Sequence, residues 1–262
     1  MVCIVYTRID EASQKMGSGV VKILGAEERE PANGMRRFGT GGIDIIETGR
    51  RIIDDIGLDS LVKTDYFIFL SRHKSARGIP SFTVHPEGNW SDEAQDGGRP
   101  KMLSMASPWQ MRDVLKRIKA HNTTDISVTY EATHHGPLLD TPSFFVEAGG
   151  NELGQVHYDI VARAVCGHVL GRASTAGEAA IGLGGTHYPE KFTRLALEDK
   201  YAFCHMMPRH NCGNTDMIEK ALERSVPAAR LAVLEWKGFG SSDQREAAVN
   251  KLSELGIDYV KV

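Results

Sequence analysis

The stretch DYFIFL, residues 65–70, is short, apolar and aromatic. This composition favours a strand near the centre of a sheet, where both of its faces are covered. Two earlier runs, VCIVY at 2–6 and IDIIE at 43–47, are also apolar and rich in β-branched residues. We therefore expect three strands in the first 70 residues, with 65–70 among the central strands of the sheet.

The segments around these runs alternate between predicted helices and predicted strands. A helix is expected at 10–24, and polar surface loops are expected at 25–42 and 88–102. Further strands are predicted at 126–130, 143–148, 179–183, 201–207, 230–236 and 257–262, and further helices at 107–121, 153–170, 189–199, 214–224 and 242–255. This alternation predicts an α/β fold with a largely parallel or mixed central sheet flanked by helices. We treat residues 1–262 as a single α/β unit, with room for a smaller α/β subdomain in its N-terminal part.

Composition and charge narrow the class of protein. The 262 residues include 41% hydrophobic and 25% charged residues, which suits a soluble protein that buries a core without disulfides. A formal net charge of −3 argues against coating of nucleic acid through bulk charge, but a local basic patch could still bind a single RNA end. No signal peptide is visible, and no run approaches the ~20 apolar residues that cross a bilayer. We expect a cytoplasmic protein that binds neither membrane nor DNA and does not require an oligomer.

The segment SPWQMRDVLKRIKAH, residues 107–121, has the clearest helix signal. Ser107 is placed to cap the helix, Pro108 suits its first position, and Gln110 would complete a capping box. Cations on this helix and in SRHKSAR (71–77) could together form an electropositive wall for phosphates: Arg112, Lys116, Lys119, Arg72, Lys74 and Arg77. A solvated charged face explains the helix residues equally well.

Five of the ten histidines follow predicted strands: His73, His85, His134, His135 and His187. Ligands of open parallel sheets bind outside the carboxyl ends of the strands, so these side chains are expected to meet in one pocket. Two roles compete for them. They can bind a metal, because imidazole is a common zinc ligand and catalytic zinc sites usually use three protein ligands. Alternatively, neutral imidazoles can act as general bases and hydrogen-bond donors without a metal.

Carboxylates and glycines accompany these histidines. Glu131 precedes His134 by three residues and Glu147 lies in the next predicted strand, so either could orient an imidazole through its second nitrogen. In GLGGTHY, residues 182–188, Gly184 and Gly185 would allow close approach of a ligand, and their amides could bind an anion. A tight turn is the alternative, and the block is not the G-x-G-x-x-G dinucleotide fingerprint.

Four blocks, taken in order, resemble one family. SRHKSARGIPSFTVHPEGNW (71–90), EATHHGPLLDTPSFFVEAG (131–149), GLGGTHYPEKFTRLALE (182–198) and EWKGF (235–239) are similar to the archaeal and plant type of D-aminoacyl-tRNA deacylase. The resemblance runs from the first predicted strand to the last. It implies a hydrolase that cleaves the ester between a D-amino acid and the 3′ end of tRNA. It also implies a zinc cofactor and a fold related to phosphorylase/hydrolase-like proteins.

The resemblance also implies roles for individual residues. Catalytic roles fall on Glu131, His134, His135 and His187, and zinc would be held by His134, His135 and His187. Substrate contacts would come from Ser71, Arg72, His73, His85, Asn89 and Lys237, and the glycine block itself adds Gly184 and Gly185.

The sequence departs from the family pattern at two positions. Thr186 stands where the family more often has glycine, which would narrow the approach to the backbone. Glu87 stands where the family has threonine, which would add a negative charge near the pocket. Two other functions stay open: a metal-dependent peptidase or amidase, and a non-catalytic protein that binds tRNA ends. The preference for D over L substrates rests on the resemblance alone.

Overall fold

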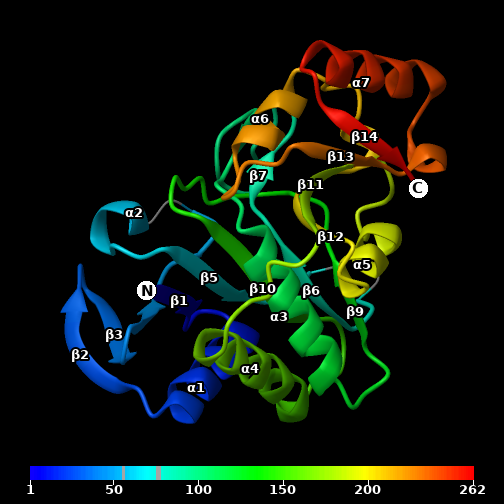
Figure 1. The fold of residues 1–262 in the computed structure, drawn as a ribbon. Helices are drawn as coiled ribbons and strands as arrows, with labels where there is room; N and C mark the ends of the chain where they lie inside the picture. Colours follow the sequence, from blue (N-terminus) through cyan, green and yellow to red (C-terminus); the bar gives the residue numbers. More distant parts are fainter. Residues whose placement is uncertain (55–56, 75–77) are drawn as a thin grey trace.

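The computed structural model describes residues 1–54, 57–74 and 78–262 (Figure 1). It contains an eight-stranded sheet in the order β2-β3-β4-β1-β5-β10-β6-β9. Four neighbouring strands in it run parallel: β4 (Ile43–Thr48), β1 (Val2–Thr7), β5 (Tyr66–Ser71) and β10 (Ser143–Gly149). Beside β10, two strands run the opposite way and are parallel to each other: β6 (Ser81–His85) and β9 (Ser127–Tyr130). The expected mixed, largely parallel sheet flanked by helices is confirmed.

Both faces of the central strands are buried, because a separate hydrophobic core lies on each side. Ile68 and Phe144 belong to the core under three helices, which cover one face of the sheet (Figure 1). Phe69 and Phe145 belong to the core on the other face, which is closed by α2 (Leu58–Leu61) and loops. The three covering helices are α1 (Glu11–Leu24), α3 (Pro108–His121) and α4 (Gln155–Leu170). The apolar run at 65–70 therefore forms a central strand, as predicted.

A second sheet has four parallel strands in the order β12-β11-β13-β14. Its strands are β11 (Glu178–Leu183), β12 (Tyr201–Met207), β13 (Leu231–Leu234) and β14 (Asp258–Lys261). The helices that follow β11, β12 and β13 are α5 (Glu190–Leu197), α6 (Met217–Glu223) and α7 (Ser242–Glu254). Short elements complete the fold: the β7 (Gly88–Asn89) and β8 (Met102–Leu103) pair, and the 3-10 helices η1 (Arg209–Asn211) and η2 (Trp236–Gly238).

No helix within 1–54, 57–74 or 78–262 has the length and apolar character needed to cross a membrane.

The predicted surface loop at 25–42 is wrong. This segment forms a hairpin, with β2 (Glu27–Ala32) and β3 (Met35–Thr40) paired antiparallel at the edge of the large sheet. Asn33 and Gly34 both have positive φ, 48° and 75°, as a tight two-residue hairpin turn requires. β2 consists mostly of exposed residues because it is an edge strand, so it lacks the apolar alternation that would have identified it.

The helix predicted at 107–121 is confirmed as α3, but two details differ. Ser107 does not cap it, since its Oγ donates to Oε1 of Gln110 at 2.7 Å. Arg112 is buried rather than solvated, and its Nη2 donates to the carbonyl of Ser174 at 2.9 Å. Lys116 forms an ion pair with Asp199. Arg112 therefore belongs neither to the predicted phosphate wall nor to a solvated face, while Lys119 is exposed and its role stays a prediction.

Candidate active site

The five histidines converge on one face of the large sheet. Side chains alternate along β10, so Phe144 points into the core beneath α1, α3 and α4, whereas Phe145 and Glu147 point to the opposite face. Glu147 is buried there, in register with Ser71 of β5 and Thr83 of β6. The imidazoles gather above this carboxylate.

The convergence has a different cause from the one expected. β6 and β9 run opposite to β5 and β10, so the carboxyl ends of the four strands do not share one edge. His85, the last residue of β6, pairs in register with Phe145 in the middle of β10. His134 and His135 follow β9, while His73 comes two residues after β5. Strands from opposite directions thus bring their histidines together over the sheet rather than beyond it.

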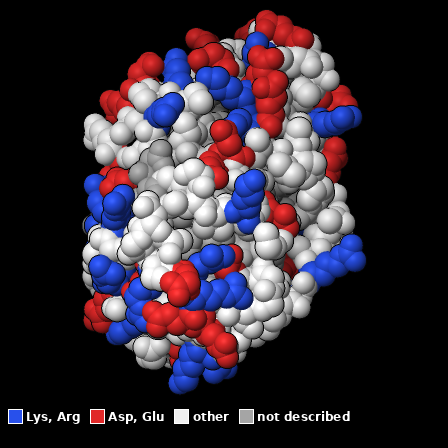
Figure 2. Space-filling view, turned by 90° about the vertical axis from the view of Figure 1, so that its left-hand side faces the viewer, with Lys and Arg blue, Asp and Glu red and all other residues white. Residues whose placement is uncertain are grey.

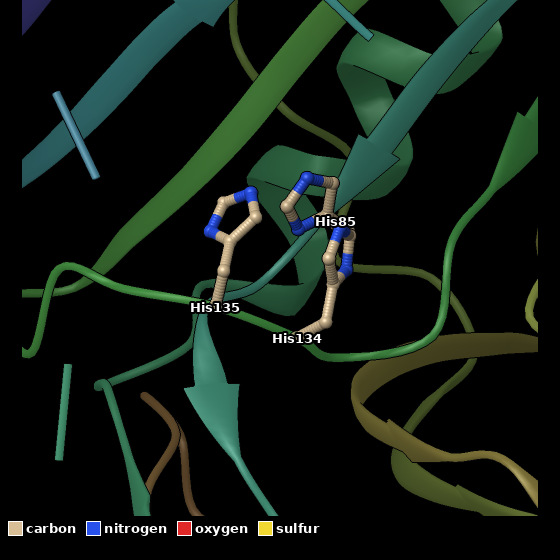
Figure 3. Close-up of side chains that lie close together, drawn as sticks. All are labelled: His85, His134 and His135. Carbon is tan, nitrogen blue, oxygen red and sulfur yellow. The ribbon is translucent and has the colours of Figure 1, made fainter. Parts of the chain in front are cut away.

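His85, His134 and His135 form a compact group of three rings (Figure 3). Their centroids lie 4.2 Å apart for His85 and His134, 5.0 Å for His85 and His135, and 4.4 Å for His134 and His135. In each ring Nδ1 bonds a main-chain carbonyl, at 3.2, 2.8 and 2.6 Å respectively. A carbonyl can only accept, so Nδ1 carries the proton and Nε2 of the neutral ring keeps its lone pair. Three nitrogen lone pairs are therefore available within one small volume.

A buried acidic cluster adjoins these rings. Nδ1 of His73 lies 3.2 Å from Oε2 of Glu131 and 3.5 Å from Oε2 of Glu147. The other oxygen of Glu131, Oε1, accepts from Nε2 of His187 at 2.9 Å. Nε2 of His85 lies 3.9 Å from Oε2 of Glu147. Two carboxylates are thus held between histidines, which makes the buried charge tolerable.

The second sheet supplies one side of the cluster. His187 follows β11, and its carbonyl accepts from the amide of Ala132 at 2.8 Å. The amide of Thr133 likewise donates to the carbonyl of Met206 in β12 at 3.0 Å. Tyr188 reaches back to the large sheet, where its hydroxyl bonds Nε2 of His73 at 2.9 Å. The cluster therefore lies where the two sheets meet.

His73 and the two glutamates form a charged set. Burial alone would lower the pKa of His73, but Glu131 and Glu147 outweigh it and raise the pKa to about 10. Burial would raise the pKa of both glutamates, but their histidine partners hold the pKa of each well below its usual range. At neutral pH we therefore treat His73 as an imidazolium between two carboxylates.

His134 and His135 are in the opposite state. Burial lowers the pKa of His134 well below its ordinary value, and repulsion from His85 lowers it further. The same two causes lower the pKa of His135 to about 4. Both rings are neutral at physiological pH, and their Nε2 atoms can act as ligands or proton acceptors.

Two hollows beside the cluster are lined by His134. One of about 390 Å³ is lined by His134 and His187 together with Asn89, Asp96 and His210. The other, of about 450 Å³, is lined by His73, His134 and His135 together with Arg51, Arg72 and Lys74. Because His134 lines both, a substrate that extends over this ring could occupy both hollows at once.

The sequence profile of the family described as D-aminoacyl-tRNA deacylase matches residues 61–260. The chain belongs to the D-aminoacyl-tRNA deacylase family. The D-aminoacyl-tRNA deacylase of Pyrococcus furiosus is 33% identical over 275 residues, covering 100% of both chains. That of Desulfurococcus amylolyticus is 32% identical over 249 residues, covering 91% of this chain and 92% of its own. A crystal structure described as a conserved protein of unknown function superposes with a TM-score of 0.90 at 25% identity, covering 100% of this chain and 95% of its own.

The cluster of this D-aminoacyl-tRNA deacylase family member contains six of the residues named from the sequence: Glu131, His134, His135, His187, His73 and His85. The grouping of possible metal ligands differs from the expected set. The side-chain nitrogens of His134 and His135 lie together with that of His85, whereas His187 lies with His134 and Glu131. His85, which was expected to contact the substrate, is thus the third member of this possible ligand group, where His187 was expected.

The backbone amides of two other residues predicted to contact the substrate are hydrogen-bonded within the protein. The amides of Gly184 and Gly185 donate to the carbonyls of Met207 and Gly238, both at 2.9 Å. The expected anion cradle is therefore wrong, because both amides already bond to protein carbonyls. Lys237 is exposed in η2, and its role stays a prediction.

Three further residues named from the sequence lie at the rim of the hollows. Nδ2 of Asn89 donates to the carbonyls of Gly97 at 2.9 Å and Arg99 at 3.3 Å, so its side chain holds the neighbouring loop. Arg72 pairs with Asp10 at 3.2 Å and lines the larger hollow together with Ser71. Arg77 of the predicted wall lies outside the described residues.

The two departures from the family pattern can now be interpreted. Glu87 is fully buried, and its Oε2 accepts from Oγ of Ser143 at 3.0 Å. Burial raises the pKa of Glu87 to about 8, so it is mostly protonated at neutral pH. Burial therefore disfavours the negative charge that was expected at this position. Thr186 is exposed and its hydroxyl donates to the carbonyl of Tyr188 at 2.7 Å.

Sequence reasoning did not single out Tyr188. It follows His187 directly, but a tyrosine at that spacing is not a recognised signal, and its contact with His73 spans 115 positions of the chain.

Proposed function

We propose that this protein hydrolyses the ester that joins a D-amino acid to the terminal ribose of tRNA, at the histidine–glutamate cluster. The observation that carries the proposal is the 2.9 Å bond from Nε2 of His187 to the buried carboxylate of Glu131, beside a hollow large enough for a substrate end. An imidazole held by a buried carboxylate is suited to act as a general base. The substrate is inferred from the names of the relatives.

In this proposal Glu131 and His187 move the proton. Glu131 accepts from Nε2 of His187, so Nδ1 is the nitrogen left to take a proton from water. The water oxygen then bonds to the ester carbonyl carbon, and Glu131 stabilises the imidazolium that forms. The imidazolium returns the proton to the departing ribose oxygen. The products are a free D-amino acid and tRNA with a free 3′-terminal hydroxyl.

The residues present fit a zinc ion, which we propose as the cofactor. His85, His134 and His135 offer three Nε2 atoms, and each ring is oriented by a main-chain carbonyl at Nδ1, as zinc-binding histidines usually are. Nε2 of His85 is also a buried nitrogen without a hydrogen-bond partner among the described residues. When bound by this set, zinc would supply Lewis-acid polarisation of the ester carbonyl.

One feature of the proposed ligand set costs free energy. Burial would lower the pKa of His85, but Glu147 outweighs it and raises the pKa. Zinc binding by His85 therefore competes with protonation of this ring, so the zinc affinity should fall as the pH falls.

Paired substrates test the proposed function. Purified protein is incubated with one tRNA charged with the D form or the L form of the same amino acid, and with a short peptide. Release of the D-amino acid well above that of the L form, without peptide cleavage, is expected. Peptide cleavage would support the peptidase alternative. Tight binding of tRNA without any hydrolysis would support the non-catalytic alternative.

A further inference from the structure

A row of cations lies at the carboxyl ends of three neighbouring strands, away from α3. β4, β1 and β5 run parallel and in register, with Thr7 level with Thr48 and Tyr6 level with Leu70. Basic residues lie within three positions of each strand end. We call this set the strand-end rim: Arg8 after β1, Arg50 and Arg51 after β4, and Arg72 and Lys74 after β5.

Main-chain bonds hold the rim in place. The amide of Arg8 donates to the carbonyl of Thr48 at 3.0 Å. The hydroxyl of Thr7 donates to the carbonyl of Arg50 at 2.8 Å. The ends of β1 and β4 are therefore tied to each other, so the two arginine backbones are fixed while their side chains are exposed. A rigid base with exposed cations suits a polyanionic ligand.

The rim has unneutralised charge. Arg72 pairs with Asp10 at 3.2 Å, and Arg51 lies 3.7 Å from Asp96. Within the described residues, no carboxylate lies within ion-pair distance of Arg8, Arg50 or Lys74. Basic and acidic side chains are interleaved on the face of the molecule shown in Figure 2. A local group of free cations on a chain of net charge −3 favours a short anionic segment over a whole duplex.

The rim is continuous with the histidine cluster. Arg51, Arg72 and Lys74 line the same hollow of about 450 Å³ as His134 and His135. A ligand whose phosphates lie on the rim can therefore place its end group over His134. The hollow of about 390 Å³ has no lysine or arginine among its lining residues, whereas Asp96 lines both hollows.

From this geometry we infer that the strand-end rim binds the phosphates of the single-stranded 3′ end of tRNA and that the aminoacyl group lies beyond His134. This inference rests on the proposed function and adds the direction in which the substrate lies. Single-stranded RNA is bound largely through backbone phosphates and cations, which makes the affinity salt-dependent.

Binding of uncharged tRNA tests the inference without requiring catalysis. The rim variant carries Arg8→Gln and Arg50→Gln, and the control variant carries Lys22→Gln and Arg163→Gln, which remove two exposed cations from α1 and α4. The rim variant should bind intact tRNA about tenfold more weakly at low salt. The slope of log affinity against log salt should fall by roughly 0.7–1 for each phosphate that the variant no longer neutralises. The control variant should match the wild type.

A truncated tRNA that lacks its 3′-terminal CCA locates the binding region on the RNA. The wild type should bind it more weakly than intact tRNA, and the rim variant should bind the two equally. Equal affinities and salt slopes for the wild type and the rim variant would overturn the inference, even if the wild type hydrolyses D-aminoacyl-tRNA. Rim-dependent binding by a protein that hydrolyses no D-aminoacyl-tRNA would instead reject the proposed function and leave the rim assignment intact. Cooperative thermal unfolding of both variants would establish that they are folded.

Discussion

Glu131 joins His73 to His187: Oε2 lies 3.2 Å from Nδ1 of His73, and Oε1 accepts from Nε2 of His187 at 2.9 Å. The carboxylate is fully buried, whereas the side chain of His187 is 39% exposed. One group therefore fixes a buried imidazolium on one side and orients a solvent-accessible imidazole on the other.

This relationship makes Glu131→Gln a sharp test of the proposed proton transfer. The amide keeps the shape of the side chain but cannot stabilise an imidazolium, so we expect the kcat for D-aminoacyl-tRNA to fall roughly 10²-fold or more. The KM should change little, because the rim still binds the RNA. Single-turnover kinetics would measure the effect, with Glu223→Gln on the exposed side of α6 as the control. A glutamine variant with wild-type kcat would remove Glu131 from the mechanism.

Zinc binding is tested by the loss of single ligands. His85→Ala and His135→Ala should each reduce bound zinc strongly, because a tetrahedral site with three protein ligands loses one of them. His121→Ala, at the exposed end of α3, should retain wild-type zinc content. Elemental analysis of the purified proteins measures zinc directly, independently of activity. If the wild type contains no zinc and stays active after chelation, the metal is not required and the histidines act alone.

His205 makes the stability depend on pH. It is fully buried, its Nδ1 lies 3.2 Å from the hydroxyl of Thr133, and its Nε2 lies 2.9 Å from the carbonyl of Arg224. Burial lowers the pKa of His205 to about 4, from 6.5 for the free side chain. The folded state therefore favours the neutral ring. Its contribution to stability is complete above the unfolded pKa and is lost as the pH falls toward the folded value.

In this window the loss is about 1 kcal/mol per pH unit. Urea denaturation at pH 7, 6 and 5 measures it. His205→Gln should be less stable than the wild type at pH 7 but should lose less stability on acidification. Parallel curves for the two proteins would show that His205 does not titrate in this window.

Gly17 is expected to be required for packing of α1. A Cβ built at this position would lie 2.1 Å from the ring of Tyr6, which is buried and donates to Oε2 of Glu47 at 2.9 Å. Gly17→Ala should therefore lower the free energy of unfolding by roughly 1–3 kcal/mol, although alanine normally favours a helix over glycine. Gly167→Ala in α4 is the matched control, because there the nearest atom belongs to the flexible side chain of Arg117 at 3.2 Å. Thermal unfolding that is unchanged by Gly17→Ala would contradict the packing argument.

Much of the fold could be predicted because the sequences of its central strands and helices have clear hydrophobic patterns. The run at 65–70 is apolar on both faces and became a central strand, and 107–121 has helical periodicity and became α3. The hairpin of β2 and β3 was missed because an exposed edge strand has no apolar alternation. The sequence also did not predict that β6 and β9 run opposite to β10, because strand direction depends on pairing between segments that are distant in the chain.

The candidate site was predictable in its residue types but not in its partnerships. Histidines placed after strands indicated a pocket, and five of them do converge. The amide of Gly184 is bonded to the carbonyl of Met207, which is 23 positions away in the chain. The sequence around Gly184 does not indicate this pairing. The state of Glu87 depends on complete burial, which a sequence pattern around one glutamate cannot show.

The main-chain bonds from Ala132 to His187 and from Thr133 to Met206 connect the two sheets within the histidine–glutamate cluster. The segment up to α4 lacks His187, and the segment from β11 onward lacks the other histidines and the two glutamates of the cluster. Under the proposed function, hydrolysis therefore requires that the two segments pack against each other. A chain cut between α4 and β11 should yield two inert fragments, and any recovered turnover would measure their reassembly.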